Sequence, residues 1–283
     1  MTRFFILTFF LCAPVTGMLS GADFMTGPDR CTINWTSGII TARGEALVSL
    51  TPAGAPVDYY DGTPTSINGA RVQSYERARE NAMENLMGTI RHLRIDPDTR
   101  LSDLISDSPY ARKRISSVLA GLSRIKKIPA SFDGARCEIR LGMGDIIASL
   151  PGEFPRQDFP TFDDPPLATD YTGLIIDGRG LDLKPMVFPS VYKEDGLEIY
   201  GRQFVDSVYA ARHGMVSYCY DDDDARRHPR AGRRPYYTVA LKNLNGCPVI
   251  ADRDARKILS GGETRNNLQK CRLILILDRE ARQ

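Results

Sequence analysis

The stretch INWTSGIITARGEA, residues 33–46, decides how the first half of this chain folds. It is rich in β-branched residues and contains the only tryptophan, Trp35, so it favours one long strand or a hairpin. Small residues stand at Gly38, Ala42 and Gly44. Because glycine within a strand often marks the close approach of another backbone, we expect the next helix to pack here. Trp35 is then a core or sheet-face anchor, and these four residues form a structural motif rather than a chemical site.

The residues that follow predict helices and then a closing strand. A loop rich in Gly, Pro and Asp occupies residues 51–69, and a helix of about six turns begins near Ser66. Its apolar residues recur every three or four positions and should face the sheet: Val72, Tyr75, Ala78, Ala82, Leu86 and Ile90. Ser108 and Pro109 are typical of an N-cap and a first helical position, and residues 135–143 alternate as a strand does.

The second half is separated from the first by a proline-rich linker at residues 151–168. Beyond it, residues 171–181 predict a strand ending in a turn, and Asp195 with Gly196 predicts a hairpin. The run CRLILILD, residues 271–278, is apolar enough to be a central strand buried on both faces. Residues 252–262 predict a short helix.

These patterns predict an α+β fold with two folded parts. Residues 23–150 should form an antiparallel or mixed sheet with helices packed on one face. Residues 169–283 should form a mostly β second subdomain with a short helix.

Residues 1–22 have the pattern of a secretory signal peptide. Arg3 precedes an apolar run, and Ser20 and Ala22 occupy the two positions that a signal peptidase reads, so we expect cleavage after Ala22. Lipid attachment at Cys12 is disfavoured because Leu11, rather than a small residue, precedes it. We therefore expect a periplasmic or outer-membrane-associated protein, with peripheral membrane association as an open alternative.

The cysteines beyond the signal peptide leave their redox state open. Five remain, which allows at most two disulfides and one unpaired thiol in an oxidising compartment. Alternatively, several are buried as small apolar side chains, a role that suits Cys271 at the start of the last strand. No pairing follows from the sequence among Cys31, Cys137, Cys219, Cys247 and Cys271.

Composition and motifs argue against most kinds of chemistry. The chain has 37 basic and 35 acidic residues that are interspersed, so nucleic-acid binding is not expected. His213, Cys219 and His228 lack the spacing that forms a zinc site, and no hydrolase or nucleotide-binding motif is found. We expect no catalytic residue, no metal and no cofactor.

Two short stretches are weak candidates for ligand binding. In the turn IDGRG, Asp177 and Arg179 flank a glycine, which suits either an anion or, more simply, a turn closed by local hydrogen bonds. In the acidic run at residues 221–224, Asp221 and Asp223 carry the charge that a cation or a charged partner would need. The spacing is not that of a calcium loop, so an exposed polar loop between two strands is the simpler interpretation.

Longer patterns resemble one family of bacterial envelope proteins. NWTSGIITARGEA followed by a Gly/Pro loop and ARENAMENLMGTI resembles the N-terminal domain of flagellar assembly protein T and of small outer-membrane lipoproteins. YTGLIIDGRGLDLKPMVFPSVYKEDGLEIYG with CRLILILD is similar to the second half of longer envelope proteins of this group. The resemblance implies a helix-on-sheet domain with a role in assembly, and it carries over no catalytic residue.

The function expected from these observations is non-enzymatic. The protein would support the assembly or interactions of a surface or flagellar structure, with envelope or flagellar proteins as partners. The alternative is a periplasmic binding protein for a small ligand or a cation.

Overall fold

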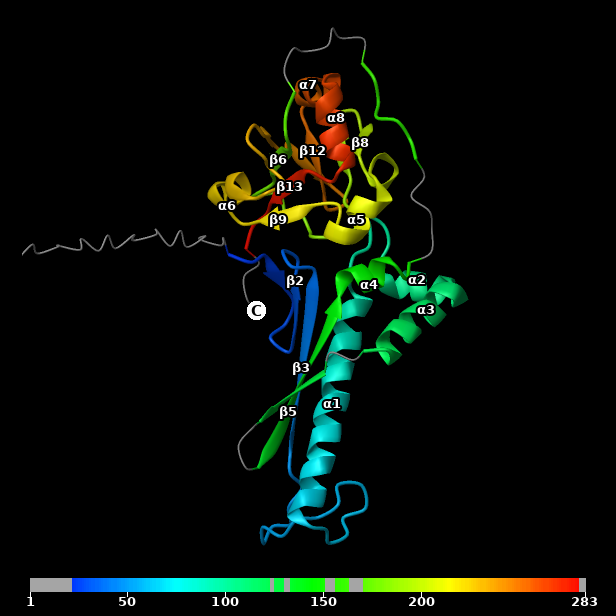
Figure 1. Cartoon of the computed structure of the whole chain (residues 1–283), viewed down its shortest axis with the longest axis vertical. Helices are drawn as coiled ribbons and strands as arrows, with labels where there is room; N and C mark the ends of the chain where they lie inside the picture. Colours follow the sequence, from blue (N-terminus) through cyan, green and yellow to red (C-terminus); the bar gives the residue numbers. More distant parts are fainter. Residues whose placement is uncertain (1–21, 123–124, 130–132, 151–155, 163–169, 280–283) are drawn as a thin grey trace, which may run out of the picture.

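A computed structural model describes residues 22–122, 125–129, 133–150, 156–162 and 170–279 (Figure 1). The predicted signal peptide up to residue 21 and most of the predicted linker lie outside these residues. Within these residues, no helix combines the length and the hydropathy that crossing a bilayer requires.

The N-terminal half contains an antiparallel five-stranded sheet in the order β1-β2-β3-β5-β4. Its strands are β1 (Met25–Thr26), β2 (Cys31–Asn34), β3 (Ile39–Leu47), β4 (Ile125–Pro129) and β5 (Gly134–Gly142). The helices of this half are α1 (Ile67–Arg91), α2 (Leu101–Asp107), α3 (Pro109–Ala120) and α4 (Met143–Ile147). The long helix α1 packs on β3 and β5, and together they form an arm that extends away from the C-terminal half (Figure 1).

The opening stretch forms a hairpin between β2 and β3. Asn34 pairs with Ile39, so Trp35 lies in the turn rather than in a strand, and Gly38 has a φ of +66°. That left-handed conformation favours glycine, so Gly38 serves the turn and does not make room for the helix. Trp35 is half-buried, and its Nε1 donates to Thr26 Oγ1 at 2.8 Å.

Gly44 is the position where β3 and α1 come closest. A Cβ on Gly44 would lie 2.1 Å from the carbonyl oxygen of Ala78 and 2.3 Å from the amide nitrogen of Ala82. Ala42, on the same face of β3, is fully buried. The predicted close packing of the helix on this strand is therefore confirmed at Gly44 and Ala42.

Side chains of α1 also bond to the edge of β3 that β2 leaves uncovered. Beyond Ala42 the strand pairs with β5 alone. Amide groups of Asn85 and Asn81 donate to the carbonyls of Arg43 and Glu45, both at 2.8 Å, and Arg77 Nη1 donates to the carbonyl of Leu47 at 3.2 Å. Four residues of a helix advance about 6.0 Å along its axis, and two residues of a strand advance about 6.6 Å. Donors spaced four apart on α1 therefore stay level with carbonyls spaced two apart on β3.

The helix begins as predicted, since the Ser66 side chain accepts a hydrogen bond from the amide of Gly69. One residue was placed on the wrong face: Val72 is 58% exposed. The buried face instead starts with small residues and continues with larger ones: Ala70, Ser74, Ala78, Ala82, Leu86 and Ile90.

The C-terminal half holds two four-stranded sheets. The first is parallel throughout, in the order β10 (Tyr236–Val239), β6 (Leu174–Asp177), β13 (Leu273–Ile276) and β9 (Ser217–Cys219). The second is mixed, in the order β11 (Lys242–Leu244), β12 (Cys247–Ile250), β7 (Val191–Lys193) and β8 (Glu198–Tyr200). The helices of the C-terminal half are η1 (Arg202–Phe204), α5 (Ser207–His213), α6 (Asp222–Arg227), α7 (Asp252–Ser260) and α8 (Gly262–Gln269).

The α+β fold class is confirmed. Strand β13 is central and buried throughout, and β7 and β8 form the hairpin around Asp195 and Gly196. Helix α7 begins at the predicted Asp252. The short helices α5, α6 and α8 accompany it and were not expected.

Both halves contribute to one hydrophobic core. Backbone amides of Val187 and Phe188 donate to the carbonyls of Arg94 and Ile95 at 3.0 and 2.7 Å, which joins the halves by main-chain hydrogen bonds. The Tyr218 ring meets the Trp35 ring edge-on at 5.4 Å. The seam between the halves is thus packed with side chains and bonded through the backbone.

The five described cysteines are all buried, and none of them forms a disulfide. Burial raises the pKa of Cys247 and of Cys271 to about 11 each. Both thiols are therefore protonated near neutral pH and act as small apolar side chains.

Replacing Gly44 with alanine tests the helix–strand contact. We expect a loss of about 2–4 kcal/mol in unfolding free energy, because the new methyl group meets helix backbone that must move. Gly88→Ala in the same helix is the matched control, since a Cβ there would meet nothing within 4 Å. The control should gain about 0.5–1 kcal/mol from helix propensity. Urea unfolding measures both, and a G44A protein as stable as the parent would contradict the contact.

The thiols offer a second test. In the native protein, Cys31, Cys137, Cys219, Cys247 and Cys271 should react with a thiol reagent at pH 8 far more slowly than in denaturant. Burial and, for at least Cys247 and Cys271, the raised pKa keep the thiolate form rare. Counting free thiols with and without guanidinium measures this, and rapid labelling of the native protein would refute it.

Candidate functional site

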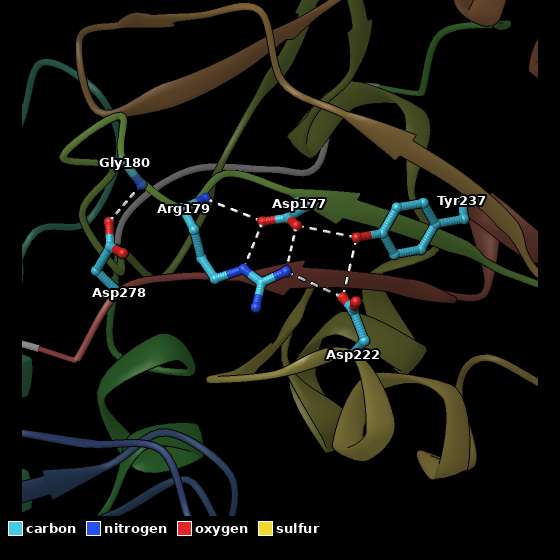
Figure 2. A network of polar contacts seen from close by, with 6 residues as sticks. All are labelled: Asp177, Arg179, Gly180, Asp222, Tyr237 and Asp278. Atoms are coloured by element: carbon cyan, nitrogen blue, oxygen red, sulfur yellow. Dashed lines mark hydrogen bonds and ion pairs between the residues drawn. The ribbon is translucent and has the colours of Figure 1, made fainter.

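Polar side chains meet where the strands of the parallel sheet end. Asp177 is the last residue of β6, Asp222 opens α6 shortly after β9, and Asp278 follows β13 (Figure 2). Tyr237 comes from β10. The carboxyl ends of parallel strands share one edge of a sheet, and this edge is where open α/β sheets bind ligands. The four side chains therefore lie where sheets of this kind bind ligands.

The turn at residues 177–180 is closed by its own side chains. Arg179 donates from Nε to Asp177 Oδ1 at 2.9 Å and from Nη2 to Asp177 Oδ2 at 2.5 Å, and its backbone amide also donates to Oδ1, at 3.1 Å. The amide of Gly180 donates to Asp278 Oδ2 at 2.7 Å, which ties the turn to the end of β13. The simpler interpretation of this turn, closure by local hydrogen bonds, is confirmed.

The acidic run is the start of a helix, so the expectation of a polar loop was wrong. Asp221 is the N-cap of α6, and its Oδ1 accepts from the amide of Asp224 at 2.8 Å. Three further acidic residues fill the first turn, and Arg226 and Arg227 fill the last turn. This charge order suits the helix dipole and was a visible signal for a helix.

The two predicted stretches do come together, but through a different residue of the run. Asp222 Oδ1 accepts from Arg179 Nη2 at 3.3 Å. Asp221 is occupied by its capping bond, and Asp223 is exposed and takes no part in the network of Figure 2. Asp222 and Tyr237 were missed because the run was taken for a loop and Tyr237 for a plain strand residue.

The Tyr237 hydroxyl lies 2.9 Å from both Asp177 Oδ2 and Asp222 Oδ1. It has a single proton to donate, so the two carboxylates share one donor between them. Burial, and then the two carboxylates, raise the pKa of Tyr237. Hydrogen bonds from Arg179 lower the pKa of Asp177, so that carboxyl is ionised near neutral pH.

We call the network of Asp177, Arg179, Asp222 and Tyr237 the clamp, because its hydrogen bonds hold neighbouring strands and α6 together. The guanidinium of Arg179 occupies the space between two carboxylates that a cation would otherwise take, and it has to leave before a metal could bind there. Among the described residues, no group of three or more His, Cys, Asp or Glu side chains is arranged to hold a metal ion. The contacts join Tyr237 of β10 and the carboxyl ends of β6 and β13 to one another and to α6.

A comparison with known protein families matches part of the C-terminal half. The family model for the second domain of Treponema pallidum Tp0624 matches residues 173–279. The match is to the part of the chain that contains the parallel sheet and the clamp. A search of curated proteins finds no match. The resemblance to flagellar assembly protein T stays a prediction.

The clamp predicts how stability depends on pH. The pKa of Asp177 is lower in the folded protein than in the unfolded chain, so its contribution is present above about pH 4 and is lost as the pH falls further. R179Q should cost about 1 kcal/mol at pH 7 and should flatten this acid-side loss. The control is R136Q, which removes the exposed Arg136–Glu45 pair. Urea unfolding between pH 3 and pH 7 distinguishes them, and parallel pH curves for R179Q and the parent would rule out the clamp.

Proposed function

We propose that this protein is a non-enzymatic component of the bacterial cell envelope that supports the assembly of a surface or flagellar structure by binding another protein. The signal-peptide pattern of residues 1–22 and the family resemblance of the sequence support a location in the cell envelope. One structural observation supports the mode of action, namely a set of exposed apolar side chains at the far end of the arm.

The tip of the arm is the segment 47–72, which joins β3 to the first turns of α1 (Figure 1). Of the fourteen exposed large apolar residues among those described, six belong to this tip: Leu47, Leu50, Tyr59, Tyr60, Ile67 and Val72. Exposed apolar patches of this kind commonly mark interaction sites. The two tyrosines suit such a role because an aromatic ring buries much area on binding.

The charge of the tip favours a protein over a membrane surface. The tip contains two acidic residues, Asp58 and Asp61, and a single basic residue, Arg71, at its helical end. Anionic lipid attracts clusters of Lys and Arg, which this segment lacks. The tip therefore suits a partner that presents apolar and basic side chains.

The tip is also held in a defined shape. Arg77 of α1 lies over the Tyr59 ring at 3.5 Å from its centroid, and Tyr59 meets Tyr60 edge-on at 5.3 Å. The amide of Tyr59 donates to Gln73 Oε1 at 3.0 Å. A partner would meet side chains that are already ordered, which lowers the entropic cost of binding.

Paired substitutions test this proposal. L50S combined with Y60S should reduce capture of a crosslinked partner from envelope extracts at least about tenfold, because truncating an interface aromatic typically costs 1–2 kcal/mol or more. The melting temperature should change little, since both side chains are largely exposed.

The control is Y110S combined with L241S. These residues have similar exposure, 57% and 50%, but lie outside the tip. Equal loss of capture in both double variants, or no loss in either, would argue against the tip as the binding surface.

A further inference from the structure

A cavity of about 670 Å³ opens at the seam between the two halves. Its wall from the N-terminal half includes the hairpin turn at residues 35–38 and the start of α4. The wall from the C-terminal half includes the end of α5 and residues next to the amino ends of β9 and β13. Pockets that bind small molecules have this size and occur preferentially at such junctions.

The charge of the wall is of one sign. Four cationic residues line the cavity together with two histidines, and no acidic residue does: the cations are Arg212, Arg230, Lys270 and Arg272, and the histidines are His213 and His228. The whole chain is nearly balanced, with 37 basic and 35 acidic residues, so this is a local feature. Among the residues that the structure describes, none of the four cationic side chains forms an ion pair with a carboxylate.

Two of the arginines are oriented by carbonyl groups instead. Arg230 is half-buried; its Nη1 donates to the carbonyl of Cys271 at 3.0 Å and its Nη2 donates to the carbonyl of His213. Arg272 Nη1 donates to the carbonyl of Thr172 at 3.3 Å. Carbonyls fix the direction of a guanidinium without cancelling its charge, so both cations are held ready for an anion.

His228 is a neutral hydrogen-bond donor in the wall of the cavity. His228 Nδ1 accepts a hydrogen bond from the amide of Arg230 at 3.1 Å, which places the proton of the neutral ring on Nε2. Burial, and then Arg230, lower the pKa of His228, so the ring is neutral near pH 7. His228 therefore contributes a hydrogen-bond donor and no positive charge to the cavity.

The remaining wall is apolar. Trp35, Met143, Ile147 and Met186 contribute to it from both halves. Inorganic phosphate would pair with the cations but would leave this apolar surface in contact with water. A ligand that fits the whole cavity carries an anionic group on an apolar body.

We propose that this cavity binds an organic phosphate, with the phosphate held by Arg230, Arg272, Arg212 and Lys270 and its apolar body against Trp35 and the methionines. Three arginines and a lysine around one group match the several acceptor oxygens of phosphate. The inference rests on the seam alone and is independent of the function proposed for the tip. A soluble organic phosphate and a phospholipid headgroup share this chemistry.

Calorimetric titration of the purified protein tests the site with three probes: inorganic phosphate, phenyl phosphate and dihexanoyl phosphatidic acid. Phenyl phosphate should bind about tenfold or more tightly than inorganic phosphate, because its ring buries apolar surface. If the short-chain phosphatidic acid binds more tightly still, the site is one for a lipid headgroup, and the reverse order assigns it to a soluble phosphate. No saturable binding of either organic phosphate would overturn the proposal.

A charge-matched pair of variants locates the site. R212Q combined with K270Q should weaken phenyl phosphate binding about tenfold, the effect of losing charge-assisted contacts. Both side chains are exposed, so the variant should melt at the parent temperature without ligand. R233Q combined with R234Q removes the same charge from exposed positions that do not line the cavity, and it should bind like the parent. Equal weakening in both would show nonspecific attraction to a basic protein and would refute the site.

Discussion

The lengthwise contact between α1 and the uncovered edge of β3 is the constraint on which the N-terminal half depends. Past Ala42, the pairing of β3 with β2 ends; the Arg43 amide still donates to the carbonyl of Arg30, but the carbonyls of β3 from Arg43 onward would be left to water or to another chain. The helix covers this edge with Arg77, Asn81 and Asn85, spaced four apart against carbonyls spaced two apart. Only a residue without a Cβ at Gly44 lets the helix come near enough to form all three bonds.

That single contact also gives the arm its two different ends. Because the helix follows the strand for the whole length of β3, the loop between them lies far from the C-terminal half (Figure 1). The other end of the same hairpin presents Trp35 to Tyr218 at the seam. A short stretch with one tryptophan and two glycines thus sets both the surface that is exposed at the tip and the surface that is buried between the halves.

Features that depend on neighbouring residues were predictable, and features that depend on distant ones were not. The start of α1 at Ser66, the hairpin at Asp195 and the buried strand β13 each have a local signal in side-chain chemistry or periodicity. The helix at Asp222 also had one, in its order of acidic and basic residues, and was missed because four adjacent carboxylates suggested a solvated loop.

The clamp and the cavity depend instead on which strands lie side by side. Asp177 meets Tyr237 because β10, sixty residues later, pairs with β6, and no local pattern specifies that order. The basic wall likewise assembles residues from α5, from the segment after α6 and from the approach to β13. Their charges are scattered among acidic residues along the chain, so the local excess exists only in three dimensions.

The two edges of the parallel sheet differ in what they leave unsatisfied. At the carboxyl edge, the carboxylates of Asp177 and Asp222 already have a guanidinium and a hydroxyl as partners, so that edge has little electrostatic energy to gain from a ligand. At the amino edge, Arg230 and Arg272 are oriented by carbonyls, which do not neutralise their charge. An ionic ligand gains most where charge is preorganised and unpaired. At the usual ligand-binding edge of such a sheet, the charged side chains of this protein are therefore already paired with one another. The cavity with unpaired cations lies at the opposite edge, where the hairpin turn at residues 35–38 and the start of α4 complete its wall.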